Sequence, residues 1–202
     1  MSPPGRPKGE YRSAQHEGTP VSTPGRPEDE SRSVQHEGAP VGGPPPSIAS
    51  RDEWIAALRW GVATGIQQGT RGLLLVDPDF AGWPLNDAAL LQAITAWLRL
   101  PQRRLVLLAA HFGEVPTRHP RFVQWRRDWA HAVQAMQAPE ELATSLPSAL
   151  LDDRHVSVHL IDPVHWRGRA SINVRDAHLL RERIDAVLQR SELAFPVNTL
   201  GL

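Results

Sequence analysis

The stretch Arg71-Gly-Leu-Leu-Leu-Val-Asp-Pro-Asp79 decides the fold class. Its apolar run, residues 73–76, is followed by Asp-Pro, which is typical of a buried strand that ends in a turn. Residues 104–110 form a second apolar run, and residues 90–98 between the two runs carry apolar side chains at helical spacing. Buried strands separated by a helix predict an α/β fold with a mixed, mostly parallel sheet flanked by helices.

Further elements extend this pattern in both directions along the chain. Upstream, Ser50 and Glu53 form a capping-box pattern before an apolar helical stripe that starts at Trp54, and Gly69 is expected to end that helix. Downstream, apolar residues from 122 to 133 repeat at helical spacing. The remaining predicted elements are a short strand at 135–138, a hairpin of 148–151 and 155–161, a loop at 167–173, a helix capped by Asp176 and a loosely packed end from 191 to 202.

The N-terminal part of the chain differs in composition from the rest. Residues 1–46 are rich in Pro, Gly, Ser, Glu and Arg, and the 18-residue segment 4–21 recurs as 24–41. A segment with so few apolar side chains cannot bury enough surface to offset its ordering entropy. We therefore predict a disordered tail at 1–46 and one α/β domain at 47–202. A short linear motif centred on the repeated Arg-Ser-x-Gln-His-Glu-Gly is the alternative interpretation of the tail.

Charge and composition exclude several function classes. Lys+Arg and Asp+Glu balance at 22 each, which argues against broad binding to nucleic acid or anionic membranes. The chain has no cysteine, so disulfides, thiolate zinc sites and a cysteine nucleophile are excluded. Neither a secretory signal nor an apolar run of about 20 residues is present, and no glycine-rich nucleotide motif occurs. We expect a cytoplasmic protein without membrane contact and without a cofactor.

Polar side chains that follow the buried strands are candidates for a ligand site. Asp77 ends the first strand and His111 follows the second, at the end of the sheet where ligands collect in open α/β folds. Asp77 could bind Mg²⁺ or act as a base, or it could simply cap the Asp-Pro turn. Farther along, Arg169, Ser171 and Asn173 could hold an anion together with backbone amides, or they could form a plain strand-to-helix loop.

The densest polar region of the sequence surrounds the predicted hairpin. Asp153, His155 and His159 belong to it, and the two histidines are spaced to share one face of a strand. Such groups could ligate a transition metal or form an acid/base pair. Their spacing matches no zinc signature, so a solvated strand face is the favoured interpretation.

Arginines and tryptophans alternate within residues 118–129. This pattern could form a nucleic-acid patch with stacking aromatic rings. It equally describes an amphipathic helix with tryptophan inward and arginine outward. The apolar period favours the helix.

The order of elements resembles one half of a phospholipase-D-like fold. In that family a hairpin carries His-x-Lys-x-x-x-x-Asp, and a Gly-Ser-x-Asn segment precedes a helix. Here the hairpin Ser145-Leu-Pro-Ser-Ala-Leu-Leu-Asp-Asp153 ends in the aspartate, but the histidine position holds Ser145 or Leu146 and the lysine position holds Pro147 or Ser148. Gly168-Arg-Ala-Ser-Ile-Asn173 resembles a loosened Gly-Ser-x-Asn.

The chain from Leu73 onward is also similar to uncharacterised bacterial domains that are sometimes joined to a GNAT-type acetyltransferase. The resemblance depends on the order of several short features. These are Val76-Asp-Pro78, the arginine-containing strand at 104–110, His119-Pro-Arg121, Asp152-Asp153 and Gln189-Arg-Ser-Glu192.

The resemblance implies a degenerate module. In active members the histidine attacks phosphorus and the lysine stabilises phosphate oxygens. The loss of both residues therefore removes the nucleophile and the positive charge that stabilises the phosphate. We expect no phosphodiesterase activity by that mechanism, but binding of a phosphate-bearing ligand or a protein partner, with a homodimer as the implied assembly. A hydrolase with a His/Asp site and a nucleic-acid-binding module stay open as alternatives. The candidate ligand-binding residues are Arg169, Ser171, Asn173, Asp77, His111, His155 and Asp153.

Overall fold

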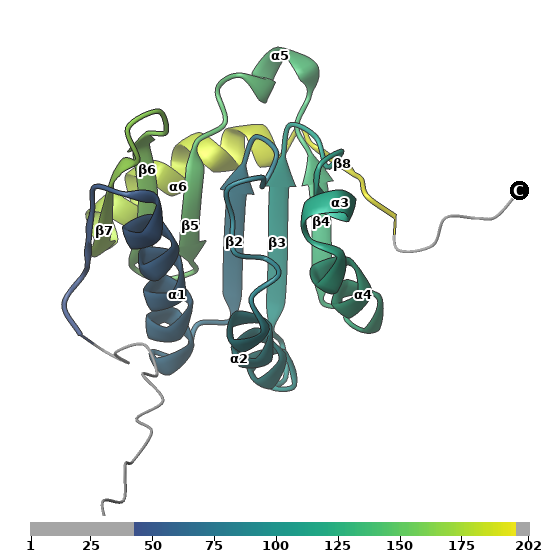
Figure 1. Ribbon diagram of the computed structural model, residues 1–202, viewed down its shortest axis with the longest axis horizontal. Helices are drawn as coiled ribbons and strands as arrows, with labels where there is room; N and C mark the ends of the chain where they lie inside the picture. Colours follow the sequence, from purple (N-terminus) through teal and green to yellow (C-terminus); the bar gives the residue numbers. More distant parts are fainter. Residues whose placement is uncertain (1–42, 197–202) are drawn as a thin grey trace, which may run out of the picture. The chain divides into compact units, whose positions relative to one another are not determined.

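A single mixed sheet organises the part of the chain that the computed structural model describes, residues 43–196 (Figure 1). Most of the predicted tail, residues 1–42, and residues 197–202 lie outside the described residues. The eight strands are ordered β1-β7-β6-β5-β2-β3-β4-β8. Their bounds are β1 Ser47–Ile48, β2 Gly72–Asp77, β3 Arg104–Ala109, β4 Val133–Gln137, β5 Ser148–Asp152, β6 Val156–Asp162, β7 Arg167–Ile172 and β8 Glu192–Leu193.

The predicted α/β class and the mixed sheet are confirmed, but the balance of strand directions differs from the expectation. Only β2–β3 and β3–β4 pair in parallel, and the other neighbouring pairs are antiparallel. The difference arises because β5 returns beside β2 in the opposite direction and continues into β6 and β7 through tight turns, which only antiparallel neighbours allow. The segment expected as a loop before the last helix is strand β7.

Helices cover both faces of the sheet (Figure 1). On one face lie α1 (Arg51–Gln67), α2 (Ala88–Leu98), α3 (Val115–Arg118) and α4 (Pro120–Asp128), and on the other lies α6 (Val174–Leu188). The short α5 (Glu140–Ala143) sits beyond one end of the strands. Each face buries its own apolar cluster, and the larger one lies on the α1 side.

Local signals for the helix ends are mostly confirmed. Ser50 accepts a hydrogen bond from the Glu53 amide at 3.2 Å, as the capping-box pattern predicts, and Gly69 takes a positive φ of 75° after α1. The last helix differs, because Asn173 caps it and Asp176 lies in its first turn. Asn173, and not Asp176, is therefore the N-cap of α6.

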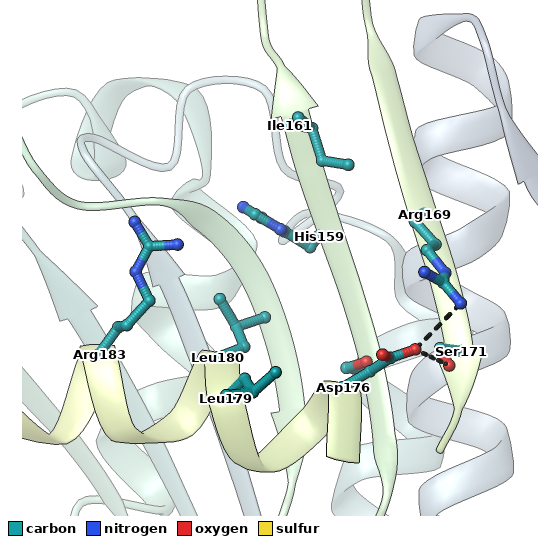
Figure 2. A pocket seen from close by; sticks show the side chains of 9 residues that line it. His159, Ile161, Arg169, Ser171, Asp176, Leu179, Leu180 and Arg183 are labelled. Carbon is teal, nitrogen blue, oxygen red and sulfur yellow. Dashed lines mark hydrogen bonds and ion pairs between the residues drawn. The ribbon is translucent and has the colours of Figure 1, made fainter. Parts of the chain in front are cut away.

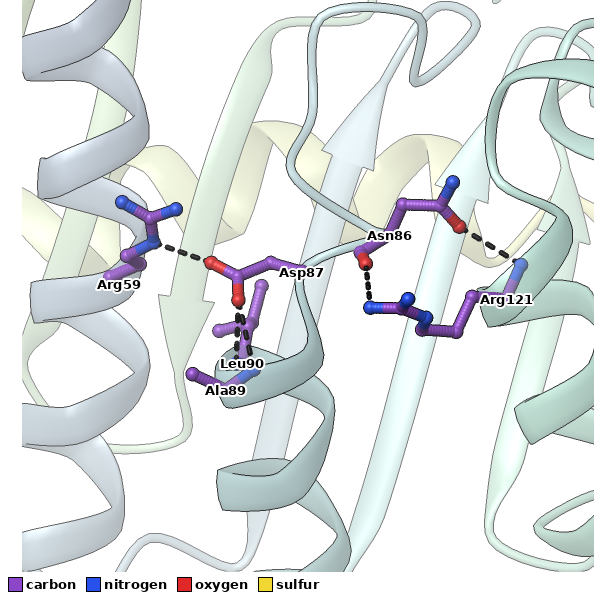
Figure 3. A network of polar contacts seen from close by, with 6 residues as sticks. All are labelled: Arg59, Asn86, Asp87, Ala89, Leu90 and Arg121. Carbon is purple, nitrogen blue, oxygen red and sulfur yellow. Dashed lines mark hydrogen bonds and ion pairs between the residues drawn. The ribbon is translucent and has the colours of Figure 1, made fainter.

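A polar network ties α1, α2 and α4 together (Figure 3). Asp87 caps α2 through the amides of its first turn and accepts a hydrogen bond from Arg59 Nε of α1 at 2.6 Å. The neighbouring Asn86 accepts a hydrogen bond from the Arg121 amide of α4 at 2.9 Å, and the Arg121 side chain donates back to the Asn86 carbonyl at 3.2 Å. The α1 side of the sheet is thus held by polar links as well as by its core.

The end of the described chain is packed, in contrast to the loose segment predicted from 191 onward. Strand β8 pairs with β4, and Arg126 Nη1 donates to the Phe195 carbonyl oxygen. The Arg126 guanidinium lies 4.9 Å from the Phe195 ring centroid, and that ring stacks 5.4 Å from Phe112. Since a buried guanidinium requires a partner, Arg126 anchors the segment that the sequence shows only as weakly apolar.

Candidate functional site

The α6 side of β6 and β7 carries polar side chains. Ser157 pairs with Ser171 across the two strands, and His159 pairs with Arg169. The apolar cluster under α6 draws residues from β2, β3 and β5 but none from β6 or β7. Helix α6 therefore seals one half of this sheet face and leaves the other half as a groove.

The groove runs between α6 and the two strands (Figure 2). Its cavity measures about 220 Å³, and an adjoining cavity of about 390 Å³ continues it toward Ser145 and Pro147. We call the joined space the Arg183 groove. Its first cavity is lined by Ser157, His159, Ile161, Arg169, Ser171, Asp176, Leu179, Leu180 and Arg183.

Asp176 organises one side of the Arg183 groove. Its carboxylate accepts a hydrogen bond from Ser171 Oγ at 2.9 Å and pairs with Arg169 Nη2 at 3.1 Å (Figure 2). These contacts fix both strand residues at the first turn of α6. Arg169 is nevertheless exposed over 68% of its side chain, so its guanidinium keeps donors available to solvent or ligand.

His159 and Arg183 occupy the other side of the groove. Within residues 43–196, neither side chain has a hydrogen bond or an ion pair with another residue, and Figure 2 shows both at the same cavity. Burial, together with the nearby Arg183 guanidinium, lowers the pKa of His159 below its ordinary value. Within residues 43–196, the groove thus offers an unpaired guanidinium, which suits an anion, beside an imidazole whose charged form is disfavoured by burial.

Two of the predicted ligand residues, Arg169 and Ser171, meet in this groove. The third member of that prediction does not line it. Asn173 Oδ1 instead accepts hydrogen bonds from the amides of Arg175 at 2.8 Å and Asp176 at 3.3 Å. Asn173 therefore acts as the N-cap of α6.

Asp77 is the last residue of β2, and its side chain caps the turn that follows the strand. Its Oδ1 accepts hydrogen bonds from the amides of Asp79 and Phe80, and its Oδ2 accepts one from Trp83 Nε1 at 2.8 Å. Burial raises the pKa of this carboxyl above its ordinary value. His111 is exposed beyond β3 and contributes no side chain to the Arg183 groove.

Asp153 and His155 lie at the opposite end of the sheet. Asp153 accepts hydrogen bonds from Thr70 Oγ1 and from the Arg71 amide, so it stabilises the turn that leads into β2. His155 precedes β6, and its carbonyl accepts the Asn173 amide at 2.9 Å. The seven predicted residues therefore lie at three different places in the fold. For the hydrolase alternative, one His/Asp pair lies together, because His159 and Asp77 line a common cavity.

The positions that the phospholipase-D resemblance assigns do not converge. Ser145 and Pro147 lie just before β5, whereas Asn173 follows the end of β7. Since β5 and β7 both run antiparallel to β6, they point the same way, and these positions lie at opposite ends of the sheet. A joint site of Ser145 and Asn173 is excluded by this topology.

The arginine-rich segment expected as a possible nucleic-acid patch is largely engaged within the fold. Arg126 is buried, and burial lowers its pKa. Arg118 pairs with Glu114, and Trp125 Nε1 donates to Thr95 Oγ1 at 2.7 Å. The segment behaves as an amphipathic helix, although Arg126 points inward rather than outward.

Two further findings concern other site classes. Among residues 43–196, no three histidine, aspartate or glutamate side chains group in a way that could hold a metal ion. Within the same range, no helix is both long and apolar enough to cross a bilayer.

Comparisons with known proteins show a fold and no family. No protein-family model and no curated protein matches the chain. One similar solved structure is TrmBL2, an archaeal chromatin protein described as showing a novel mode of DNA binding, with a TM-score of 0.52 at 10% identity. The match covers 76% of this chain and 56% of that protein, so this chain spans about half of its length. At this identity the likeness concerns the fold alone.

Sequence reasoning missed Arg183 and the role of Asp176. Arg183 sits on α6 between the buried Leu180 and Ile184, so helical periodicity alone gives it no distinction. The available signal was on β6, where Ser157 and His159 alternate with buried valines. That polar face was interpreted as solvated, whereas Ser157 is buried and His159 is half-buried beneath α6.

Proposed function

We propose that this domain is a non-catalytic, degenerate phospholipase-D-like module that binds a phosphate-bearing ligand in the Arg183 groove. The observation that carries the proposal is the Arg183 guanidinium, which has no partner within residues 43–196 and lines the same cavity as His159. Phosphate oxygens accept charge-assisted hydrogen bonds, and a guanidinium supplies donors in a fork that matches them. Arg169 offers a second guanidinium across the groove.

The groove also has an apolar side, which limits the kind of ligand. Leu179 and Ile161 line it and remain 53% and 65% exposed. A ligand whose phosphate meets Arg183 would cover these side chains with its organic part, and area removed from water contributes about 25 cal/mol per Å². The proposed ligand is therefore an organic phosphate rather than the bare ion.

Absence of catalysis is supported by the residues at the assigned positions. The candidate histidine and lysine positions hold Ser145 or Leu146 and Pro147 or Ser148, and the only lysine of the chain is Lys8. Residues 43–196 therefore contain no lysine. Asp77, the carboxylate that shares a cavity with His159 in the hydrolase alternative, already accepts three hydrogen bonds.

Calorimetric titration with a set of phosphorylated metabolites tests this function. We expect at least one organic phosphate to bind more tightly than inorganic phosphate, and Arg183→Ala to weaken that binding about tenfold or more, because a charge-assisted hydrogen bond is lost. Arg175→Ala is the matched control, since Arg175 is an exposed arginine of the same helix that does not line the groove.

Three results would contradict the proposal. An equal loss of phosphate affinity in the Arg183 and Arg175 variants would mean that only the net charge of the protein matters. Binding of short DNA or RNA that survives Arg183→Ala would favour the nucleic-acid alternative instead. Turnover of a phosphodiester by the full chain would contradict the non-catalytic assignment. The implied homodimer is a separate prediction, which sedimentation velocity of the same samples checks.

A further inference from the structure

A second cavity lies at the carboxyl end of β2 and differs in character from the Arg183 groove. It measures about 370 Å³ and is walled by the loop after β2, the segment before β5 and the β6–β7 turn. We call it the Trp166 cavity. Its lining is Trp54, Asp77, Pro78, Asp79, Gly82, Leu146, Pro147, Ser148, His159, Leu160, Ile161, Pro163 and Trp166.

The charge of this cavity is acidic. Asp77 and Asp79 both line it, and no arginine does, although 17 arginines occur among the described residues. The Arg183 groove next to it is lined by Arg169 and Arg183. Neighbouring cavities of opposite sign select different ligands, so the Trp166 cavity is not an extension of the phosphate site.

Two indole rings supply the aromatic wall. Trp54 is almost fully buried in α1, whereas Trp166 is half-buried in the β6–β7 turn. Trp166 adopts a positive φ of 54°, which is uncommon for a bulky residue, and its ring lies so close to Gly82 that a Cβ there would approach within 3.2 Å. The tight fit holds the Trp166 ring in place over the loop that carries Asp79.

The hydrogen-bonding state of the carboxylates discriminates between neutral and charged ligands. Both oxygens of Asp77 already accept bonds from the Asp79 and Phe80 amides and from Trp83 Nε1, and Asp79 Oδ1 accepts the Ala81 amide at 2.8 Å. A polyol would find few free acceptors here. A cation still feels the field of both carboxylates and can reach the partly exposed Trp166 ring.

We infer that the Trp166 cavity is a binding site for a small organic ammonium ion, with the Trp166 indole and the Asp77–Asp79 turn as its recognition elements. This site goes beyond the proposed phosphate function, because none of the arginines of that function lines it. His159, Ile161 and Pro147 are shared with the groove, so an ammonium and a phosphate would sit as neighbours.

Titration of the full chain with tert-butylammonium chloride tests the inference, with ¹H–¹⁵N spectra of the tryptophan indoles as readout and sodium chloride holding ionic strength constant. We expect saturable shifts of the Trp54 and Trp166 signals, assigned by single Trp→Phe variants, and no such shifts at Trp97. The neutral tert-butanol has the same shape and should bind about tenfold more weakly or not at all.

Asp79→Asn removes the charge while keeping the oxygen that caps Ala81, so the loop is expected to stay folded. It should weaken tert-butylammonium about tenfold, whereas Asp128→Asn, an exposed carboxylate outside the cavity, should not change it. Equal affinity for the ammonium and the alcohol would overturn the inference in favour of a plain apolar cavity. An unchanged affinity in Asp79→Asn, or no shift at Trp54 and Trp166, would overturn it outright.

Discussion

The two faces of the sheet differ in how completely they are covered. On the α1 side, four helices pack over the strands, and indole and guanidinium donors such as Trp97 Nε1 and Arg59 Nε reach acceptors within the fold. On the α6 side, one helix covers β2, β3 and β5, and the rest of the face stays polar and open. Arg183 and His159 lie in that open part.

The difference separates residues that stabilise the fold from residues that are available to a ligand. A buried polar group without a partner is destabilising, so a folded chain satisfies most such groups where helices close over them, although Thr64 Oγ1 and His119 Nδ1 have no partner among residues 43–196. A partly covered face can leave a guanidinium unpaired because water reaches it. We therefore attribute stability to the α1 side and propose ligand binding for the groove on the α6 side.

The largest expected effect is in the core of the α1 side. Trp97 is 1% exposed and donates its Nε1 hydrogen to the Thr70 carbonyl at 2.9 Å. Trp97→Ala should lower the free energy of unfolding by about 3–5 kcal/mol, measured by urea denaturation. Leu179→Ala at the exposed wall of the groove should change it by about 0.5 kcal/mol or less. A similar loss of unfolding free energy in the two variants would contradict the proposed difference in coverage between the two faces.

The spacing of β6 and β7 beneath the groove should produce the next largest effect. A Cβ at Gly168 would lie 2.6 Å from the His159 carbonyl oxygen and 3.2 Å from Leu160 Cα. Because backbone atoms must move, Gly168→Ala should lower the free energy of unfolding by about 1–3 kcal/mol. Gly113→Ala, whose Cβ would meet only His111 Nδ1 at 3.8 Å, is the control. Equal stability of both variants would mean that the strand spacing is not constrained.

Substitutions of Asn173 distinguish a helix-capping role from a ligand-binding role. Asn173→Ala should lower the free energy of unfolding by about 1 kcal/mol and change the affinity for an organic phosphate by less than about twofold. Asn173→Asp should restore most of the stability, since aspartate accepts the same amides. A large loss of affinity at unchanged stability would instead place the amide in the site.

The pH dependence of stability should show the smallest effect. Because the pKa of His159 is lowered in the folded state, the unfolded chain binds its proton first as the pH falls. The contribution of this histidine to stability is present above its ordinary pKa, about 6.5, and declines as the pH drops below it. Urea denaturation at several pH values should therefore show a weaker decline in His159→Gln than in the wild type. An identical profile would contradict the burial of this imidazole.

The buried strands and most helices could be predicted from sequence because their signals are local. The apolar run before Asp77 forms β2, and the Ser50 and Gly69 signals mark the ends of α1. The wrong balance of parallel and antiparallel pairs has a nonlocal origin. The sequence of residues 148–172 carries no local signal for the pairing of β5 with β2, because this contact joins segments about 75 residues apart.

The candidate site was predictable only in part, since it depends on what α6 covers. Arg169 and Ser171 were found because small and polar residues precede a helix, but β7 was mistaken for a loop. Arg183 could not be singled out, because a helix surface carries many arginines and only the sheet beneath it shows which one faces a cavity. Asp77, Asp153 and Asn173 each cap backbone amides close in sequence or space, a role that the sequence alone does not distinguish from ligand binding.

The protonation of His159 tests the ligand-binding assignment most directly. We would titrate its imidazole by NMR in the full chain, with and without the tightest organic phosphate found by calorimetry. An anion bound between Arg183 and His159 favours the charged imidazole, so the account predicts a higher pKa for His159 in the complex and no rise in Arg183→Ala. A His159 pKa that is unchanged by a bound phosphate would contradict the assignment of the Arg183 groove as the binding site.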